Sequence, residues 1–346
     1  MLLTIAAAAF VFGLLVLFHE FGHFITAKLT GMRVDEFAIG FGPRIVSFRY
    51  GETVYSLRAV PLGGFNDIAG MDPATNEEAD GRGYLSKPVW ARMIVISAGA
   101  MMNFILPIFL FWGIFAFAGI SSPSPEPVLG EVMADKPAYI AGLRNGDRIV
   151  RIDGKEIDSW QTFVKVIANA DGKIFQVEYQ RDGELKTTRL IPEYDKKAKR
   201  SLIGVISDSK TEYPGVVESG VLAVKKTGFI IYKMLEGLVQ LITGQAPSAE
   251  ISGPIGVAQM AGEVAHLGFL PLLNFAALLS LNLGVINMLP VPALDGGHFL
   301  ALIIELFRGK PMSEKMTHYT QMFGITVLLA LMLFATKNDI VRLFLG

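Results

Sequence analysis

The feature that most constrains this chain is an HExxH motif at the end of an apolar segment. His19-Glu20-Phe21-Gly22-His23 follows Met1–Phe18, which carries no charged side chain. Positions four apart share one face of a helix, so both imidazoles can reach one metal ion. Glu20 projects beside them and can take a proton from a water at that metal. Because these polar groups are costly in hydrocarbon without partners and a task, the motif predicts a zinc site in a membrane.

Composition agrees with that setting. The 346 residues are 51% hydrophobic and 18% charged, with a mean hydropathy of +0.44, which is typical of a membrane protein with a soluble part. The formal net charge of −1 gives no electrostatic case for binding nucleic acid. Cysteine is absent, which excludes thiol catalysis and disulfides and leaves histidine and carboxylate as the strong zinc ligands.

Hydropathy predicts a polytopic α-helical membrane protein with four transmembrane helices, at 1–29, 93–120, 267–294 and 319–336. The first loop, 30–92, is rich in Lys and Arg, and no charge precedes the first span. The positive-inside rule therefore places this loop in the cytoplasm and both termini outside. The HExxH motif then lies toward the cytoplasmic side. The loop and helix at 295–318 are predicted to be cytoplasmic as well.

The first loop contains a predicted β-hairpin. Ile45–Tyr50 and Thr53–Val60 are rich in β-branched and aromatic residues and flank Gly51-Glu52. Such a hairpin beside an active site can offer an edge strand to an extended substrate. The alternative is a cytoplasmic cap with no role in substrate binding. In the second span, Gly99 and Asn103 share one helix face, where helix packing and a catalytic role both remain open.

A soluble module follows the second span. The run from Ala141 to Ile149, followed by Ile152-Asp153-Gly154, resembles the AGL-x-x-GD-x-I…I-x-G signature of bacterial PDZ domains. We therefore expect an extracytoplasmic PDZ (α+β) domain at 127–195. Such domains bind chain termini or extended peptides by strand addition, although this one could also act only as a size-excluding cap. Amphipathic helices lying at the membrane interface are predicted at 215–266.

The third span ends in a run that contains Pro290 and Pro292 shortly before Asp295. Two prolines end or break a helix, and irregular backbone at membrane depth is tolerated only where protein or a water-filled cavity covers it. Asp295 can supply a third zinc ligand and leave one position open for water. His298 lies three residues further on and competes for that role, and spacing alone does not decide between them.

Together, the HExxH motif, the Leu294-Asp295-Gly296 run and the intervening PDZ signature resemble the site-2 protease family of intramembrane zinc metalloproteases, in its bacterial RseP/RasP-like branch. The resemblance covers nearly the whole chain. It implies that His19, His23 and Asp295 bind Zn²⁺ and that Glu20 is the general base.

The same resemblance implies that Asn282 and Asn287 help to hold an unwound substrate. It also implies that the hairpin around Gly51 is a membrane-re-entrant β-element and that His298 is not a ligand. The chain carries one PDZ-like module where some relatives carry two, which affects how substrates are admitted.

The resemblance further implies an enzyme of the bacterial cytoplasmic (inner) membrane that acts in regulated intramembrane proteolysis. Its expected substrates are single-pass membrane proteins, cut in or near the transmembrane segment. They include anti-sigma-factor-like proteins after a first cleavage, and remnant signal peptides are a second class. The lipid bilayer and a peptide or truncated ectodomain terminus at the PDZ are the other expected partners, and no nucleic acid is expected.

Two hypotheses from other functional classes compete with the protease hypothesis. A non-catalytic membrane adaptor would bind peptides through its PDZ and keep zinc for structure, but a structural site does not need Glu20. A transporter with a metal site at mid-membrane would be expected to show inverted repeats of spans, and none is evident in the sequence.

Overall fold

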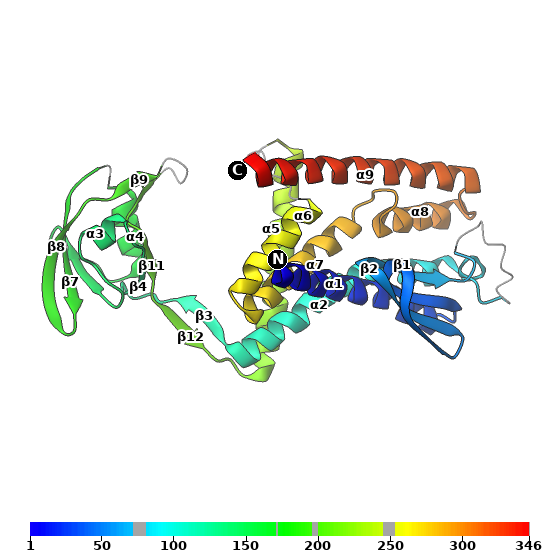
Figure 1. The fold of residues 1–346 in the computed structure, drawn as a ribbon, viewed down its shortest axis with the longest axis horizontal. Helices are drawn as coiled ribbons and strands as arrows, with labels where there is room; N and C mark the ends of the chain where they lie inside the picture. Colours follow the sequence, from blue (N-terminus) through cyan, green and yellow to red (C-terminus); the bar gives the residue numbers. More distant parts are fainter. Residues whose placement is uncertain (72–80, 171, 196–199, 245–252, 346) are drawn as a thin grey trace. The chain divides into compact units, whose positions relative to one another are not determined.

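The computed structural model describes residues 1–71, 81–170, 172–195, 200–244 and 253–345. The chain divides into two compact units (Figure 1). Unit 1 comprises Met1–Ile114 and Gly215–Gly346, and unit 2 comprises Phe115–Pro214. Unit 1 holds the long helices and the N-terminal hairpin, whereas unit 2 is rich in short strands.

Among the described residues, four helices are long and apolar enough to cross a membrane, which is the predicted number. They are α1 (Leu2–Leu29), α2 (Val89–Ala118), α7 (Phe269–Asn287) and α9 (Glu314–Leu345). Helix α7 is shorter than the predicted span 267–294 because the chain leaves the helix before the two prolines. Helix α9 is longer than 319–336 because polar residues continue the helix beyond its apolar stretch.

The described part of unit 1 contains three further α-helices: α5 (Val216–Ile242), α6 (Pro254–His266) and α8 (Asp295–Arg308). Helix α6 packs against α1, α7 and α9. Its first turn is joined to α9 by the buried carboxylate of Asp339, which accepts hydrogen bonds from Gly253 N at 3.0 Å and Gly256 N at 2.8 Å. These contacts satisfy backbone groups that have no partner within α6 itself.

The hairpin extends well beyond the predicted strands, with β1 at Val34–Tyr50 and β2 at Thr53–Ile68. Its antiparallel register is irregular: residue Ala38 pairs with Phe65 and also with Ser56, so the start of β1 lies between two stretches of β2. Gly40 has φ +87°, and a Cβ there would lie 2.7 Å from Val60 O. Gly40 therefore bends a long strand and does not end it.

A buried carboxylate network stabilises this hairpin. Glu36 accepts hydrogen bonds from Arg44, Ser56 and Arg58, which come from β1 and β2. Burial opposes the charge of Glu36, but these three donors outweigh it and lower the pKa of the carboxyl to about 2.

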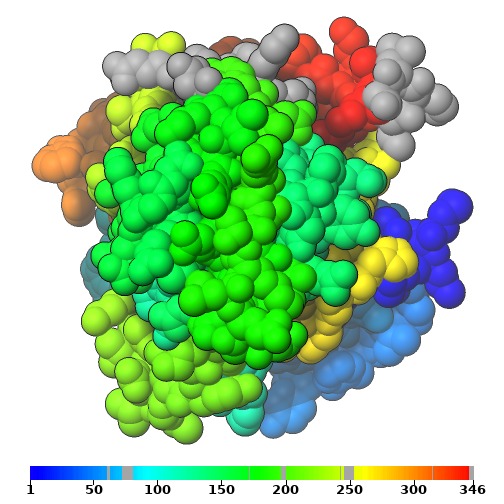
Figure 2. All heavy atoms as spheres, turned by 90° about the vertical axis from the view of Figure 1, so that its left-hand side faces the viewer, coloured from blue at the N-terminus to red at the C-terminus, as the bar shows by residue number. Residues whose placement is uncertain are grey.

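Unit 2 is built on a four-stranded antiparallel sheet with the order β6-β5-β7-β8. Its central strands are β5 (Arg148–Ile152) and β7 (Phe175–Arg181), and its edge strands are β8 (Glu184–Leu190) and the short β6 (Lys155–Glu156). Helix α4 (Trp160–Ala168) begins at Ser159, whose side chain accepts from Thr162 N, and the short α3 spans Pro137–Ile140. Figure 2 shows one face of this unit in green.

Short strands extend unit 2 on both sides of the predicted range 127–195. Strand β11 (Val205–Ser207) pairs with β4 (Leu129–Val132), and β12 (Ser209–Glu212) pairs with β3 (Ile120–Pro123). A further small hairpin joins β9 (Glu193–Asp195) to β10 (Arg200–Leu202). Strands β3 and β9 to β12 have three or four residues and leave little periodicity in the sequence, so the pattern did not indicate them.

Candidate metal centre

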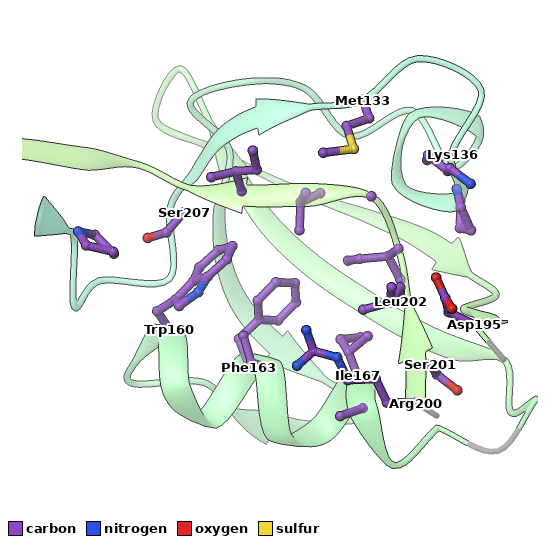
Figure 3. Close-up of a pocket in the computed structure, with 18 of the residues that line it drawn as sticks. Met133, Lys136, Trp160, Phe163, Ile167, Asp195, Arg200, Ser201, Leu202 and Ser207 are labelled. Carbon is purple, nitrogen blue, oxygen red and sulfur yellow. The ribbon is translucent and has the colours of Figure 1, made fainter. Parts of the chain in front are cut away.

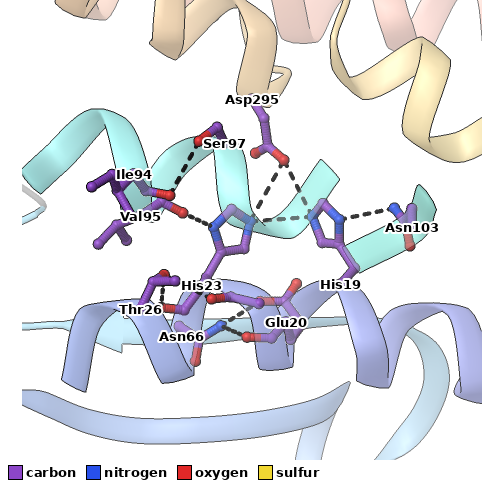
Figure 4. A network of polar contacts seen from close by, with 11 residues as sticks. His19, Glu20, His23, Thr26, Asn66, Ile94, Val95, Ser97, Asn103 and Asp295 are labelled. Atoms are coloured by element: carbon purple, nitrogen blue, oxygen red, sulfur yellow. Dashed lines mark hydrogen bonds and ion pairs between the residues drawn. The ribbon is translucent and has the colours of Figure 1, made fainter. Parts of the chain in front are cut away.

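Three side chains from distant parts of the chain converge on one point (Figure 4). His19 and His23 come from α1, and their Nε2 atoms lie 3.3 Å apart. Asp295 is the first residue of α8, and its Oδ2 lies 3.5 Å from His19 Nε2 and 3.6 Å from His23 Nε2. Ligands about 2.0–2.2 Å from a tetrahedral zinc ion are separated by roughly 3.3–3.6 Å. The three atoms therefore have the spacing of a tetrahedral metal site.

The protonation requirements of these groups also fit a metal ion. Asp295 Oδ2 is buried and has no hydrogen-bond partner among the described residues. The two facing Nε2 atoms cannot both carry a hydrogen at 3.3 Å. A divalent cation between two lone pairs and a carboxylate satisfies all three groups at once.

Helix α2 orients both histidines. His23 Nδ1 donates to Val95 O at 2.8 Å, which leaves the Nε2 lone pair directed into the site. The Asn103 amide, fully buried, has its Nδ2 3.1 Å from His19 Nδ1, and its Oδ1 has no partner among the described residues. A half-turn of this amide lets Oδ1 accept the Nδ1 hydrogen that His19 carries when its Nε2 binds a metal.

Gly99 gives His23 its space. A Cβ at Gly99 would lie 2.1 Å from His23 Nε2, closer than any side chain allows. Gly99 and Asn103, which the sequence left open between helix packing and a catalytic role, both contact the histidines of the HExxH motif. The sequence offered no sign of the Val95 carbonyl, because a backbone acceptor has no residue signature.

Glu20 is held by the hairpin. Asn66 Nδ2, from β2, donates to Glu20 Oε2 at 2.7 Å and to Glu20 O at 2.8 Å. The strand comes this close because Gly64 has no side chain, since a Cβ there would lie 2.9 Å from Glu20 Cγ. Sequence reasoning missed Asn66, and the signal that could have found it is the neighbouring Gly63-Gly64 pair, which is typical of a close backbone approach.

The remaining predicted residues lie outside this convergence. Asn282 is exposed on α7, and Asn287, its last residue, is half-buried. His298 lies on α8 one turn after Asp295. Among the described residues, the His, Asp and Glu ligand atoms that fall within 4.8 Å of one another are those of His19, His23 and Asp295. The geometry therefore brings Asp295, and not His298, to the histidines.

A family model described as Peptidase family M50 matches residues 7–331. The chain belongs to peptidase family M50. It is 33% identical over 420 residues to the regulator of sigma-W protease RasP of Bacillus subtilis, with 99% of each chain covered. It is 33% identical over 422 residues to the zinc metalloprotease RasP of Bacillus licheniformis, covering 99% of this chain and 100% of the relative.

A third relative and one solved structure complete the comparison. The zinc metalloprotease RasP of Geobacillus kaustophilus is 32% identical over 413 residues, with 97% of each chain covered. The PDZ domain of an SdrC-like protein from Listeria monocytogenes is 25% identical, covering 25% of this chain and 90% of its own, with a TM-score of 0.21. Membership of family M50, in the branch of the RasP proteins, makes this chain a zinc metalloprotease.

Proposed function

We propose that this member of family M50 hydrolyses peptide bonds in or near the transmembrane segment of single-pass membrane proteins. The observation that carries the proposal is the convergence of His19, His23 and Asp295 beside Glu20. Two of the helices that build this site, α1 and α2, are apolar enough to cross a membrane.

In the proposed site, His19, His23 and Asp295 would hold Zn²⁺, which would supply Lewis-acid activation of the scissile carbonyl and of a water near neutral pH. Glu20 accepts the proton of the attacking water and returns it to the leaving amine. Asn66 fixes the direction of the Glu20 carboxylate, while Val95 and Asn103 fix the two imidazole rings.

The substrate segment must be extended before it can be cut, because a helix keeps its carbonyls in internal hydrogen bonds. Strand β2 runs directly beside Glu20 through Gly64 and Asn66, which supports the hairpin as the element that receives an extended substrate. Asn282 and Asn287 on α7 are proposed to bind the same unwound segment.

Unit 2 offers a second binding surface. A cavity of about 1090 Å³ lies between α4 and the chain from Leu202 to Ser207 (Figure 3). Trp160, Phe163 and Ile167 of α4 line one side of it. We propose that it is the peptide groove of a PDZ domain, which takes the newly made terminus of a shortened ectodomain. Quenching of tryptophan fluorescence when peptides with an apolar terminal residue are titrated into the protein would support this. An unchanged fluorescence at millimolar peptide would contradict it.

The proposed setting is the cytoplasmic membrane of a bacterium, with both termini outside and the metal site toward the cytoplasmic side. The basic residues of the first loop support this orientation. Because the Bacillus subtilis relative is named as a regulator of sigma-W, an anti-sigma-factor-like protein already shortened by another protease is the substrate class to test first. Remnant signal peptides are the second class.

The direct test uses purified protein in liposomes with a tagged single-pass substrate. Wild-type protein is expected to release a fragment whose new end, located by mass spectrometry, lies within or next to the transmembrane segment. A Glu20→Gln variant keeps the ligands and removes the base, so it should retain zinc and lose cleavage. Equal cleavage by this variant, or a cut far outside the membrane segment, would contradict the proposal.

A further inference from the structure

One face of α2 contacts both histidines of the metal centre. Arg92, Val95, Gly99 and Asn103 are spaced three or four residues apart, so they lie along one side of the helix. Val95 and Gly99 contact His23, and Asn103 contacts His19. Arg92, at the start of this row, contacts neither histidine and reaches α8 instead.

Arg92 forms a two-pronged ion pair with Glu305 of α8. The Nη2–Oε1 distance is 2.6 Å and the Nη1–Oε2 distance is 3.0 Å. The two side chains are only 7% and 11% exposed. Arg92 Nε also donates to Lys87 O at 3.1 Å, and the guanidinium lies 5.7 Å from the centre of the Tyr84 ring. Such a planar, doubly bonded pair fixes orientation as well as distance.

Helix α8 has few buried residues. Among its described residues, only Gly296 and Leu302 are buried, and Leu302 packs with the partly buried Phe299 into a core cluster that includes Ala27 and Val95. Asp295 is its first residue, and Glu305 lies ten positions later, about 15 Å along the axis. The N-terminal end is set by Gly296, whose missing side chain lets the backbone approach Leu289 O. Beyond this apolar packing, the other end is joined to α2 by the ion pair, so rotation or sliding of α8 would move Asp295 relative to the histidines.

We propose that the Arg92–Glu305 ion pair is a positioning device for the metal centre: it aligns α8 on α2, and so places the Asp295 carboxylate against His19 and His23. The proposal rests on the proposed role of Asp295 as the third ligand. Helix α2 then orients all three ligands, two directly and the third through α8. Removing one partner leaves a buried charge without compensation, which displaces the helix that carries it.

Metal affinity of the full-length protein in detergent, measured by chelator competition, tests this without an activity assay. Arg92→Gln and Glu305→Gln are each expected to weaken zinc binding about 10- to 100-fold, as loss of a residue that orients metal ligands does. The double variant should be no weaker than either single one, because the two residues act as a unit. Arg92→Lys keeps the charge, folds more readily and should lie between wild type and Arg92→Gln.

Substitution of Co²⁺ for zinc provides a second measurement, because the visible absorption spectrum of bound Co²⁺ reports the geometry of its ligands. It should change in Glu305→Gln and stay unchanged in Arg181→Gln, the matched control. Arg181 makes the same kind of pair with the buried Asp147 in unit 2, at 2.7 Å through Nε and Nη2, and unit 2 contains none of the proposed ligands. The control separates loss of a buried ion pair in general from loss of this one.

An Asp295→Ala variant distinguishes the positioning role of the ion pair from the assignment of Asp295 as the third ligand. If Asp295→Ala weakens zinc binding while Glu305→Gln binds with wild-type affinity and spectrum, the positioning role is overturned and the ligand assignment stands. If Asp295→Ala binds zinc as wild type does, the ligand assignment itself is overturned. Additive losses in the Arg92→Gln/Glu305→Gln double variant would also contradict a joint role.

Discussion

Gly99 lies where α2 crosses the helix of the HExxH motif. An alanine there would place its Cβ 2.1 Å from His23 Nε2 and push the ring out of the site. We expect Gly99→Ala to weaken zinc binding about 10- to 100-fold and to abolish most cleavage. Gly113→Ala on the same helix is the control, since a Cβ there meets nothing within 4 Å. Zinc retention on dialysis against a chelator measures both, and equal retention would contradict the crowding.

Asn66 acts on the base and not on the metal. Its amide donates to Glu20 Oε2 at 2.7 Å, and a hydrogen bond to a charged group contributes about 1.5–3 kcal/mol. Asn66→Ala is therefore expected to lower kcat by roughly 10- to 100-fold while zinc content and KM stay near wild type. Steady-state kinetics with parallel zinc analysis provide the measurement. A loss of zinc, or a change confined to KM, would contradict a role of Asn66 in orienting the Glu20 carboxylate.

Among the elements, the hairpin should be the part most sensitive to acid. The pKa of Glu36 is about 2 in the folded protein against an ordinary value of 4.5. A depressed pKa stabilises the fold above pH 4.5, and this contribution, about 3 kcal/mol, is lost as the pH falls toward 2. The thermal unfolding midpoint of wild type should therefore fall over this window.

Glu36→Gln provides the comparison. This variant lacks the titrating group, so it should be less stable than wild type at pH 7, and its midpoint should change less between pH 4.5 and 2. The two curves should approach each other at the acid end. Parallel curves across the window would mean that another group governs the acid sensitivity of the unit.

Some elements could be predicted from the sequence and others could not, for physical reasons. Long apolar runs specify α1, α2 and α9 because few other structures satisfy their backbone in lipid. The length of the hairpin strands was underestimated because glycine is also the residue that ends strands in turns, so the sequence does not distinguish a bend from a turn. Strand β11 was missed because its few residues acquire their role only by pairing with β4, a contact between distant positions.

The same division holds for the site. The HExxH spacing indicated two ligands and a base within one turn of helix, and the proline-broken run pointed to Asp295. The residues that orient them, Asn66 and Asn103, come from other elements, and local sequence does not reveal which side chain they face. The resemblance to the site-2 proteases named the family, and the match to family M50 confirmed it.

For the whole molecule, the division into units makes a separate prediction. All three proposed ligands and Glu20 belong to unit 1. Ile120 pairs directly with Glu212, close to the two points where the chain enters and leaves unit 2. Paired Cα atoms in such a ladder are about 4.5–5.5 Å apart, so a short Asn-Gly turn can replace residues 121–211. The shortened protein should bind zinc like the full chain and cleave a shortened substrate.

The same deletion tests the role of unit 2. If unit 2 excludes bulky substrates, its removal should permit cleavage of a single-pass protein that still carries an intact ectodomain, assayed by immunoblot of the tagged fragment. Cleavage of the shortened substrate alone would contradict a gating role. Loss of zinc from the shortened protein would contradict the independence of unit 1.

The central claim is that a zinc site is assembled from α1 and α8, far apart in the sequence. The measurement that tests it most directly is an anomalous difference map at the zinc edge from crystals of the zinc-bound protein. The account predicts one peak about 2.0–2.2 Å from His19 Nε2, His23 Nε2 and a carboxylate oxygen of Asp295. A peak bonded to His298, or one that Asp295 does not contact, would contradict it.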